Sequence, residues 1–423
     1  MNQNTADIAI IGAGAAGLMA AISAGRAAKD AGQRLRIIAL DGANTIGAKI
    51  LVAGGGRCNV THAQGSPLDY AGDSANSIRK VLRSFTFDDT VAFFREIGVE
   101  LKKEDTGKLF PVTDRARTVL NALLDECRNL QVDIVNPWRV NSIEETDSGL
   151  LLTSTAGETI EARKAILATG GKALPKSGSD GQGYSLAKAL GHTCTPEIFP
   201  ALAALKLDQQ ETTICQLTGI ATPAQIVICS GTNKHLWKSG ADDTLITHFG
   251  LSGPAPMNAS RHWTAARRKD PNAMMYVNWA PYSKTLLDTR ITQGGKRSIR
   301  RVAPVGIATR LLKWMCEQVG ADISGPASDL DRYQRAELAN YMHSWPAPIT
   351  GDRGFTHAEA TAGGIPLKQI HLTTMRSRHC GNLYLCGEIL NVDGRIGGFN
   401  FQWAWSTGHL AGQGAARSIC GQT

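Results

Sequence analysis

The stretch 7–41 reads DIAIIGAGAAGLMAAISAGRAAKDAGQRLRIIALD, and it decides the fold of the chain. Its first five residues are mostly apolar and β-branched, so a buried strand is predicted over 7–11. The glycine pattern G-x-G-x-x-G follows over 12–17. A helix is then expected over 18–31, and a second strand over 35–40 before the closing aspartate. This order of strand, glycine turn, helix, strand and acid is typical of a dinucleotide-binding βαβ unit.

The glycine turn suits a pyrophosphate. Gly12 permits the tight turn, Gly14 lets the backbone approach the phosphates, and Gly17 lets the helix pack closely on the strand. Free N–H groups at the start of the helix would face the phosphates. Asp41 would accept hydrogen bonds from ribose hydroxyls, which disfavours a 2′-phosphate. The alternative, a tight turn in an ordinary α/β domain, is weaker because strand, helix and acid all fall in place. The predicted cofactor contacts in this unit are Gly12, Ala13, Gly14, Ala15, Ala16, Gly17, Asp41 and Gly42.

Three further segments favour FAD over NAD. In 47–60, three consecutive glycines stand before Arg-Cys-Asn, a backbone-rich loop that could lie against a flat ring; a flexible surface loop is the alternative. In 164–171 a predicted strand ends in Ala-Thr-Gly-Gly, and in 382–388 another ends in Gly-Glu. A helix is expected to begin near Gly397 and could point its positive end at the pyrimidine edge of a flavin. The predicted contacts in these segments are Gly47, Lys49, Gly55, Gly56, Arg57, Cys58, Asn59, Ala168, Thr169, Gly170, Gly387, Glu388, Asp393, Gly397, Gly398, Phe399 and Asn400.

The predicted fold is α/β, with one cofactor domain made from both ends of the chain. NAD domains are usually contiguous, whereas two-part FAD domains are usually not, so small turns at both ends favour FAD. We expect a two-part Rossmann-like FAD-binding domain over 1–195 and 351–423. Residues 196–350 are expected to form an inserted substrate domain, β-rich and then helical. Within the insertion the pattern predicts strands over 224–229 and 274–279 and helices over 300–319 and 329–343.

Composition limits the class of protein. Of the 423 residues, 43% are hydrophobic and 19% are charged, below the usual ~25%, so intrinsic disorder is excluded as the main state. The nine cysteines are odd in number and none has C-x-x-C spacing, which favours reduced thiols in the cytoplasm. No histidine spacing suits a metal, so no metal is expected. No uninterrupted run of 18 apolar residues occurs, and neither a transmembrane helix nor a signal peptide is predicted.

The formal net charge of +8 is concentrated in one segment. Residues 261–313 contain twelve basic and two acidic residues, a net charge of +10. A localised basic stretch indicates a polyanionic partner, and interspersed aromatic rings could stack on the bases of single-stranded RNA. The alternative is a solvated basic face whose aromatic rings belong to the core. The aromatic residues are Trp263, Tyr276, Trp279, Tyr282 and Trp314.

Together these motifs resemble the BaiN/RdsA family of flavin oxidoreductases, also called YhiN-like. The matching strings are GGGRCN at 54–59, LFPVTD at 109–114, ATGGK at 168–172, THFGLSGP at 247–254, TAGGI at 361–365 and GEILNVDGRIGGFNFQWAW at 387–405. The resemblance implies tightly bound FAD and an inserted substrate domain. Known members look like an rRNA dihydrouridine synthase, an enone-type steroid reductase and an amine oxidase. The chain departs from the family pattern at Asp41, His62, Leu174 and Asn391. These departures indicate a divergent subgroup.

The resemblance implies an FAD-dependent oxidoreductase, and three residues are candidates for its proton donor. Reduction of a carbon–carbon double bond needs a general acid beside the flavin. Cys58, His248 and Lys49 qualify by residue type and motif position. The alternatives are a small packed residue for Cys58, a hydrogen-bonded structural histidine for His248 and, for Arg57, a salt bridge. Glu388 is expected to bind FAD rather than to move protons.

The electron donor and the substrate are hypotheses at this level. No second G-x-G-x-x-G pattern marks a nicotinamide domain, so NAD(P)H, if it is used, would bind transiently over the flavin. The leading hypothesis is a reductase of an unsaturated substrate, with an rRNA uracil as the best single choice and either RNA or a small molecule as the partner. The alternatives are an oxidase of a small amine and a flavin-bearing RNA-binding protein without turnover.

Overall fold

The computed structural model of the chain describes residues 4–421, which form two compact units. Unit 1 comprises Met1–Pro200 and Glu359–Thr423, and unit 2 comprises Ala201–Ala358. Both ends of the chain therefore contribute to unit 1, and unit 2 is an insertion. The chain changes units after residues 200 and 358, where the sequence analysis placed the changes after 195 and 350.

The predicted βαβ unit is confirmed in unit 1. Strand β1 (Thr5–Ile11) is followed by the glycine turn, helix α1 (Ala15–Asp30) and strand β2 (Ile37–Leu40). The helix begins three residues before the predicted start because the glycine turn itself closes at Gly14, the N-cap residue. Small apolar residues let α1 pack closely against the sheet, and twelve of its sixteen residues are buried.

The centre of unit 1 is a parallel sheet with the strand order β22-β10-β1-β2-β7. Strand β10 (Thr159–Leu167) pairs with β1 on one side and with β22 (Leu383–Leu385) on the other. The registers place Ile11, Leu40, Leu167 and Leu385 at one edge of the sheet. Because ligands of open parallel sheets bind outside the carboxyl ends of the strands, this edge is where a cofactor is expected.

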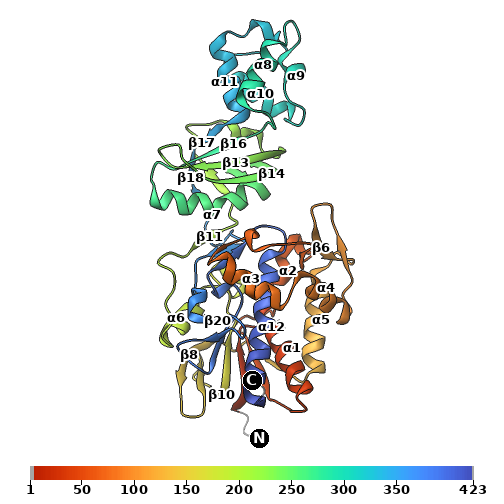
Figure 1. Ribbon diagram of the computed structural model, residues 1–423, viewed down its shortest axis with the longest axis vertical. Helices are drawn as coiled ribbons and strands as arrows, with labels where there is room; N and C mark the ends of the chain where they lie inside the picture. The colour runs from red at the N-terminus through yellow and green to blue at the C-terminus, as the bar shows by residue number, and fades with distance from the viewer. Residues whose placement is uncertain (1–3, 422–423) are drawn as a thin grey trace. The chain divides into compact units, whose positions relative to one another are not determined.

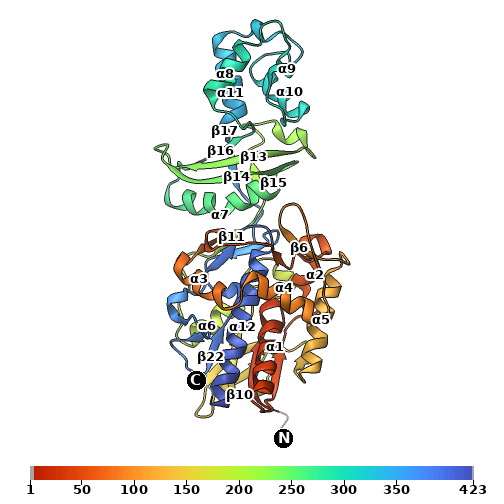
Figure 2. The same cartoon turned by 45° about the vertical axis from the view of Figure 1, so that its right-hand side comes forward.

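The first and last helices of the described chain pack against each other. Helix α12 (Phe399–Cys420) and α1 lie side by side in both views (Figures 1 and 2). A Cβ added at Gly408 would lie 2.4 Å from the carbonyl oxygen of Ala16, and one at Gly412 would lie 2.1 Å from that of Ala20. These glycines allow backbone contact between the helices, and this contact fixes the C-terminal part of unit 1 on the βαβ unit.

The remaining elements of unit 1 surround this core. They are α2 (Ala48–Gly56), β3 (Thr61–His62), η1 (Pro67–Asp69), β4 (Tyr70–Gly72), α3 (Ala75–Ser84), α4 (Phe87–Glu96), β5 (Leu101–Lys103), β6 (Lys108–Pro111), α5 (Ala116–Asn129), β7 (Asp133–Val135), β8 (Val140–Glu145), β9 (Leu150–Ser154), η2 (Pro175–Ser177), α6 (Gln182–Ala189), β19 (Ala360–Ala362), η5 (Leu367–Gln369), β20 (Ile370–His371), β21 (Arg376–Ser377), η6 (Gly387–Ile389) and β23 (Val392–Gly394). Strand β11 (Phe199–Ala201) pairs with β19 where the chain leaves unit 1. The pairing of β23 with β4 again joins the two ends of the sequence.

Unit 2 is built on an antiparallel seven-stranded sheet with the order β17-β16-β13-β14-β15-β12-β18. Helix α7 (Pro254–Lys269) lies along one face of this sheet, and the other helices of unit 2 gather on its opposite side (Figure 1). The strands are β12 (Leu205–Leu207), β13 (Ala221–Cys229), β14 (His235–Thr247), β15 (Gly250–Ser252), β16 (Met274–Asn278), β17 (Trp345–Ala347) and β18 (Ile349–Asp352). The predicted strands over 224–229 and 274–279 are confirmed as β13 and β16.

The single helix predicted over 300–319 is wrong. The segment forms α9 (Ile299–Val302) and α10 (Thr309–Gln318), with an irregular turn between them. Pro304 lacks the backbone N–H that a continuous helix needs, and Gly306 has a φ of +106°, so the helix ends before them. The helix predicted over 329–343 is observed as α11 (Arg332–His343). The remaining elements of unit 2 are η3 (Ile214–Leu217), α8 (Lys284–Thr292) and η4 (Ala327–Asp329).

Residues 4–421 contain neither a membrane-spanning helix nor a group of metal-ligating side chains. Every helix in that range is too short or too polar to cross a membrane. Within the same range no three His, Cys, Asp or Glu side chains are grouped in a way that could hold a metal ion.

Candidate active site

The glycine turn after β1 is fixed by close backbone packing. Gly12 has a φ of +100°, and a Cβ added there would lie 2.6 Å from the carbonyl oxygen of Ala168. A Cβ added at Gly17 would lie 1.8 Å from the carbonyl oxygen of Gly12. At Gly14, in contrast, an added Cβ would meet nothing within 4 Å. The turn is therefore closed toward the sheet and open on its other side, as the predicted pyrophosphate contact requires.

The start of α1 is free to bind an anion. Gly14 supplies no side-chain cap, and the first turn contains no acidic residue. The N–H groups of that turn and the positive end of the helix dipole therefore act together on this open side. Asp41 flanks the turn, accepting from the N–H of Ala13 and from that of Ala43, each at 2.7 Å. A carboxylate has further lone pairs, so Asp41 can also accept from a ribose hydroxyl.

The segment 47–59 is a short helix followed by a glycine loop. The predicted loop is helical at its start, because α2 begins at Ala48, but the backbone leaves the helical region at Ala53. Gly54, Gly55 and Gly56 then have φ values of +58°, +70° and +85°, which favour glycine. An added Cβ at Gly55 would meet nothing within 4 Å, so this part of the loop is open to a ligand.

An ion pair joins this segment to the C-terminal part of unit 1. Lys49 Nζ lies 2.5 Å from Glu388 Oε2, and the exposed fractions of the two side chains are 27% and 16%. Gly387 has a φ of +80°, and a Cβ added there would lie 2.8 Å from the Cβ of Ala16. The Gly-Glu turn therefore lies against the first turn of α1. Segments about 340 residues apart meet at the carboxyl ends of the strands, as the two-part prediction requires.

Four buried polar atoms near this junction have no hydrogen-bond partner among residues 4–421: Thr169 Oγ1, Ser179 Oγ, Tyr184 Oη and Glu388 Oε1. Each unsatisfied buried group costs about 1–3 kcal/mol. Two of these hydroxyls lie close to glycines. A Cβ added at Gly170 would lie 2.7 Å from Ser179 Oγ, and one at Gly183 would lie 1.8 Å from Thr169 Oγ1. A polyhydroxylated, polar ligand would satisfy them, and the sugar and ribityl hydroxyls of FAD have this character.

Tyr184 and Ser179 were not selected from the sequence. Both belong to the string GSDGQGY at 178–184, which begins seven residues after the Ala-Thr-Gly-Gly turn ends at Gly171, and its three glycines were the available signal. Burial, and then the charge of Glu388, raises the pKa of Tyr184 well above its ordinary value. The phenol therefore keeps its proton and can donate it in a hydrogen bond.

The start of α12 is built differently from the start of α1. Its N-cap residue, Gly398, has a φ of +91°, and it supplies no side-chain cap. Asn59, with its amide oriented to suit its neighbours, accepts from the N–H of Gly398 at 3.0 Å and donates to the carbonyl oxygen of Thr61 at 2.9 Å. Asn400 closes the preceding turn by two hydrogen bonds to Gly394. Phe399 is fully buried, backbone and side chain together, so its predicted contact with a cofactor stays a prediction.

Arg57 forms a salt bridge, which was the alternative to its predicted contact with FAD. Its guanidinium lies 2.7 Å from Glu104, 3.6 Å from Asp114 and 4.0 Å from the centre of the Phe110 ring. The predicted contact of Arg57 with FAD would have to be made from this arrangement.

The three candidate proton donors are divided between the units. Cys58 is fully buried with a φ of +63°, and burial raises the pKa of its thiol to about 12. This favours the packing role, because such a thiol is a weak acid near neutral pH. Lys49 lies at the junction described above. His248 belongs to unit 2, in the exposed turn between β14 and β15, where its carbonyl oxygen accepts from Gln209 Nε2 at 2.9 Å.

The basic segment of unit 2 has exposed cations but no exposed tryptophans. Trp263, Trp279 and Trp314 are buried in the core of the unit, so their predicted stacking on RNA bases is wrong. Tyr276 and Tyr282 are half-buried. The exposed cations are Arg267, Arg268, Lys269, Lys284, Lys296, Arg297, Arg300, Arg301, Arg310 and Lys313.

Comparisons with known proteins agree with this fold. The family described as HI0933-like protein Rossmann domain matches residues 6–414. A 3-dehydro-bile acid delta(4,6)-reductase from Clostridium scindens is 33% identical over 97% of this chain and 98% of its own length. A ribosomal RNA dihydrouridine synthase from Escherichia coli is 30% identical over 96% of this chain and 97% of its own. Among solved structures, the E. coli quinol fumarate reductase chain FrdA matches 98% of this chain and 70% of its own, with a TM-score of 0.52 and 16% identity, which supports the fold alone.

Proposed function

The chain belongs to the HI0933-like Rossmann family of FAD-dependent oxidoreductases, and on that premise we propose that it reduces a carbon–carbon double bond conjugated to a carbonyl group. The activities for which these two relatives are named share this chemistry, since the double bonds of a 3-dehydro-Δ4,6 bile acid and the C5–C6 bond of uracil are both conjugated to a carbonyl. The structural observation that carries the proposal is the Lys49–Glu388 pair, in which the amine of Lys49 lies where the N-terminal and C-terminal parts of unit 1 meet.

Different residues of unit 1 are proposed to bind different parts of the cofactor. Once bound and reduced by the electron donor, FAD would supply the hydride. The first turn of α1 binds the pyrophosphate through its N–H groups, and Asp41 accepts from ribose hydroxyls. Thr169, Tyr184 and Glu388 offer their unsatisfied atoms to the remaining hydroxyls of the cofactor. The positive end of α12 stabilises negative charge on a ligand at its first turn.

Lys49 is the proton donor that we propose for the substrate carbon. Its Nζ carries the proton, and Glu388 orients it through the 2.5 Å contact. Of the other candidates, Cys58 is the weaker acid, because burial raises the pKa of its thiol. His248 belongs to unit 2, and its candidacy as the proton donor stays a prediction.

An rRNA uracil is the substrate that we propose first. It is supported by the dihydrouridine synthase relative and by the ten exposed cations between Arg267 and Lys313, which suit a phosphate backbone. A small enone is the second candidate, favoured by the identity to the bile acid reductase and by the burial of the three tryptophans. NAD(P)H is the proposed electron donor, and the nine free thiols support a cytoplasmic location.

One anaerobic experiment tests the proposal. The FAD-loaded protein is reduced with NADH or NADPH, and unmodified rRNA or a 3-oxo-4-ene steroid is added. We expect the flavin absorbance to return as the product gains two hydrogens by mass spectrometry. If the flavin stays reduced with both substrates and is reoxidised only by air, with peroxide release and turnover of a small amine, the oxidase alternative replaces this proposal.

A further inference from the structure

Arg395 has no role in the function proposed above, yet it stands in the loop that leads into α12. It lies between the Asp-Gly turn and the glycine pair Gly397-Gly398, both predicted to contact the cofactor. Its side chain is 43% exposed. An arginine in this position is close to the proposed chemistry, and it remains accessible to a ligand.

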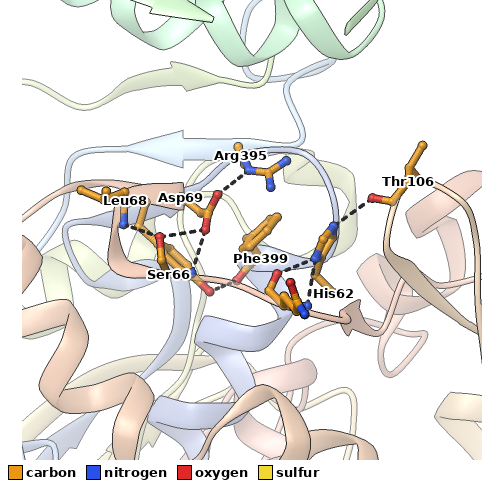
Figure 3. Close-up of polar contacts among 9 residues, drawn as sticks. His62, Ser66, Leu68, Asp69, Thr106, Arg395 and Phe399 are labelled. Carbon is orange, nitrogen blue, oxygen red and sulfur yellow. Dashed lines mark hydrogen bonds and ion pairs between the residues drawn. The ribbon is translucent and has the colours of Figure 1, made fainter. Parts of the chain in front are cut away.

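The side chain of Arg395 is held by two contacts. Its Nε donates to Asp69 Oδ1 at 2.7 Å, and its guanidinium lies 4.4 Å from the centre of the Phe399 ring (Figure 3). The backbone N–H of Arg395 also donates to the carbonyl oxygen of Asp69 at 3.0 Å. The guanidinium is therefore oriented before any ligand arrives, which reduces the entropy lost on binding.

The surface on which Arg395 rests is itself rigid. The ring of His62 stacks on Phe399 with a 5.0 Å separation of centres and a 25° angle. The nitrogens of that ring lie 2.5 Å from the carbonyl oxygen of Gln64 and 3.0 Å from that of Thr106, which fixes the ring plane (Figure 3). Tyr70 donates its hydroxyl hydrogen to the carbonyl oxygen of Phe399 at 3.1 Å.

Arg395 contacts one oxygen of the Asp69 carboxylate, Oδ1, and the other oxygen is held by Ser66. Asp69 Oδ2 accepts from the N–H of Ser66 at 2.7 Å and lies 3.2 Å from Ser66 Oγ, as part of a capping box. The contact with Arg395 uses only Nε–H, whereas a guanidinium has five N–H donors. The fork formed by Nη1 and Nη2 matches a carboxylate or a phosphate in a bidentate manner.

We propose that Arg395 determines substrate specificity by binding an oxyanion of the substrate, a carboxylate or a phosphate, through its guanidinium fork while Asp69 holds Nε. The inference rests on the proposed function, because it assumes that the substrate binds beside the start of α12. Leu68, next to Asp69 in η1, is 85% exposed and would add an apolar contact for the body of the substrate.

The test measures binding without turnover. Oxidised, FAD-loaded protein is titrated with two matched pairs of probes, 3-oxo-4-cholenoic acid against its methyl ester and uridine 5′-monophosphate against uridine, and the change in flavin absorbance gives each Kd. We expect the wild-type protein to bind the anionic member of one pair about ten- to a hundredfold more tightly, the effect of charge-assisted hydrogen bonds. The pair that shows the difference identifies the source of the oxyanion.

Three variants locate the effect. R395Q is expected to abolish the discrimination, and R395K to lose most of it because an ammonium lacks the fork. D69N is expected to keep it, because Asp69 only orients the guanidinium. The control R128Q removes an exposed arginine paired with Asp125 on α5 and should keep the wild-type values.

The proposal is overturned if the wild-type protein binds both members of both pairs equally, or if R395Q and R395K still discriminate. If R395Q does not fold, R395K decides. Absence of turnover with either class of substrate, alongside intact discrimination, would count against the proposed reaction and leave the role of Arg395 standing.

Discussion

The starts of α1 and α12 are both predicted to contact the cofactor, but they are held in place in different ways. Both are uncapped helix starts after glycines of positive φ, and neither has an acid in its first turn. The start of α1 is fixed almost entirely by backbone, through Gly12 and Gly17. The start of α12 is surrounded by side chains, among them His62, Phe399 and Arg395. We propose that the first binds phosphate through its backbone, whereas the second depends on the side chains around it.

The largest effect is expected at the backbone site. In G17A the added Cβ would lie 1.8 Å from the carbonyl oxygen of Gly12, which the backbone cannot accommodate without moving the turn. We expect a loss of about 3 kcal/mol or more in unfolding free energy and a protein that is purified without yellow colour. Chemical denaturation and flavin absorbance measure both.

The matched control for that prediction is G14A. Its Cβ would meet no atom within 4 Å, so the fold should be retained while the affinity for FAD falls. Equal melting and equal FAD content of G17A and the wild-type protein would contradict the close packing at this turn.

The next effect concerns the Lys49–Glu388 pair, which joins α2 to the C-terminal part of unit 1. E388Q replaces the charge-assisted contact with Lys49 and keeps the volume of the side chain. Because both side chains are partly exposed, we expect only about 1 kcal/mol of lost stability, but about tenfold weaker FAD binding. Isothermal titration of the apoprotein with FAD gives the affinity. The surface control R128Q should bind FAD as the wild type does, and unchanged affinity in E388Q would remove Glu388 from the cofactor site.

A smaller effect is expected at the side-chain site. H62A removes the ring stacked on Phe399, and such pairs contribute about 0.5–1.5 kcal/mol. We expect the melting temperature to fall by a few degrees and the affinity for FAD to fall severalfold, because the first turn of α12 is less well held. If H62A matches the wild-type protein in both measurements, the start of α12 does not depend on its side chains.

The smallest effect is expected for Cys58. C58A should keep FAD content and turnover within about twofold, because burial raises the pKa of the thiol to about 12 and leaves it a packing residue. Steady-state kinetics measure the effect, with whichever candidate substrate reoxidises the flavin in the anaerobic experiment. A loss of a hundredfold or more in kcat would restore Cys58 as the proton donor.

The α1 site could be predicted from sequence because its determinants are local. The glycines, the helix and Asp41 lie within 35 consecutive residues, and each has a direct conformational reason. The two-part fold was also predictable, since short turns after strands recur at both ends of the chain. The break at Pro304 was available in the sequence but was outweighed by the amphipathic pattern around it.

The partners of side chains could not be predicted in the same way. The salt bridge of Arg57 with Glu104, the contact of Arg395 with Asp69 and the burial of the tryptophans of unit 2 depend on tertiary packing. Charge and residue type show that a side chain can form an ion pair or pack in a core. They do not show which neighbouring side chain it contacts. The unsatisfied hydroxyls of Ser179 and Tyr184 likewise become visible only when their surroundings are known.

The central claim is that both helix starts hold one FAD molecule. Hydrogen–deuterium exchange of the apoprotein and the FAD-loaded protein tests it most directly, by following the backbone amides of 12–18 and of 397–402. The account predicts that FAD slows exchange in both segments, with the same dependence on FAD concentration and one FAD bound per chain. Protection of 12–18 alone, with 397–402 unchanged at saturating FAD, would contradict it.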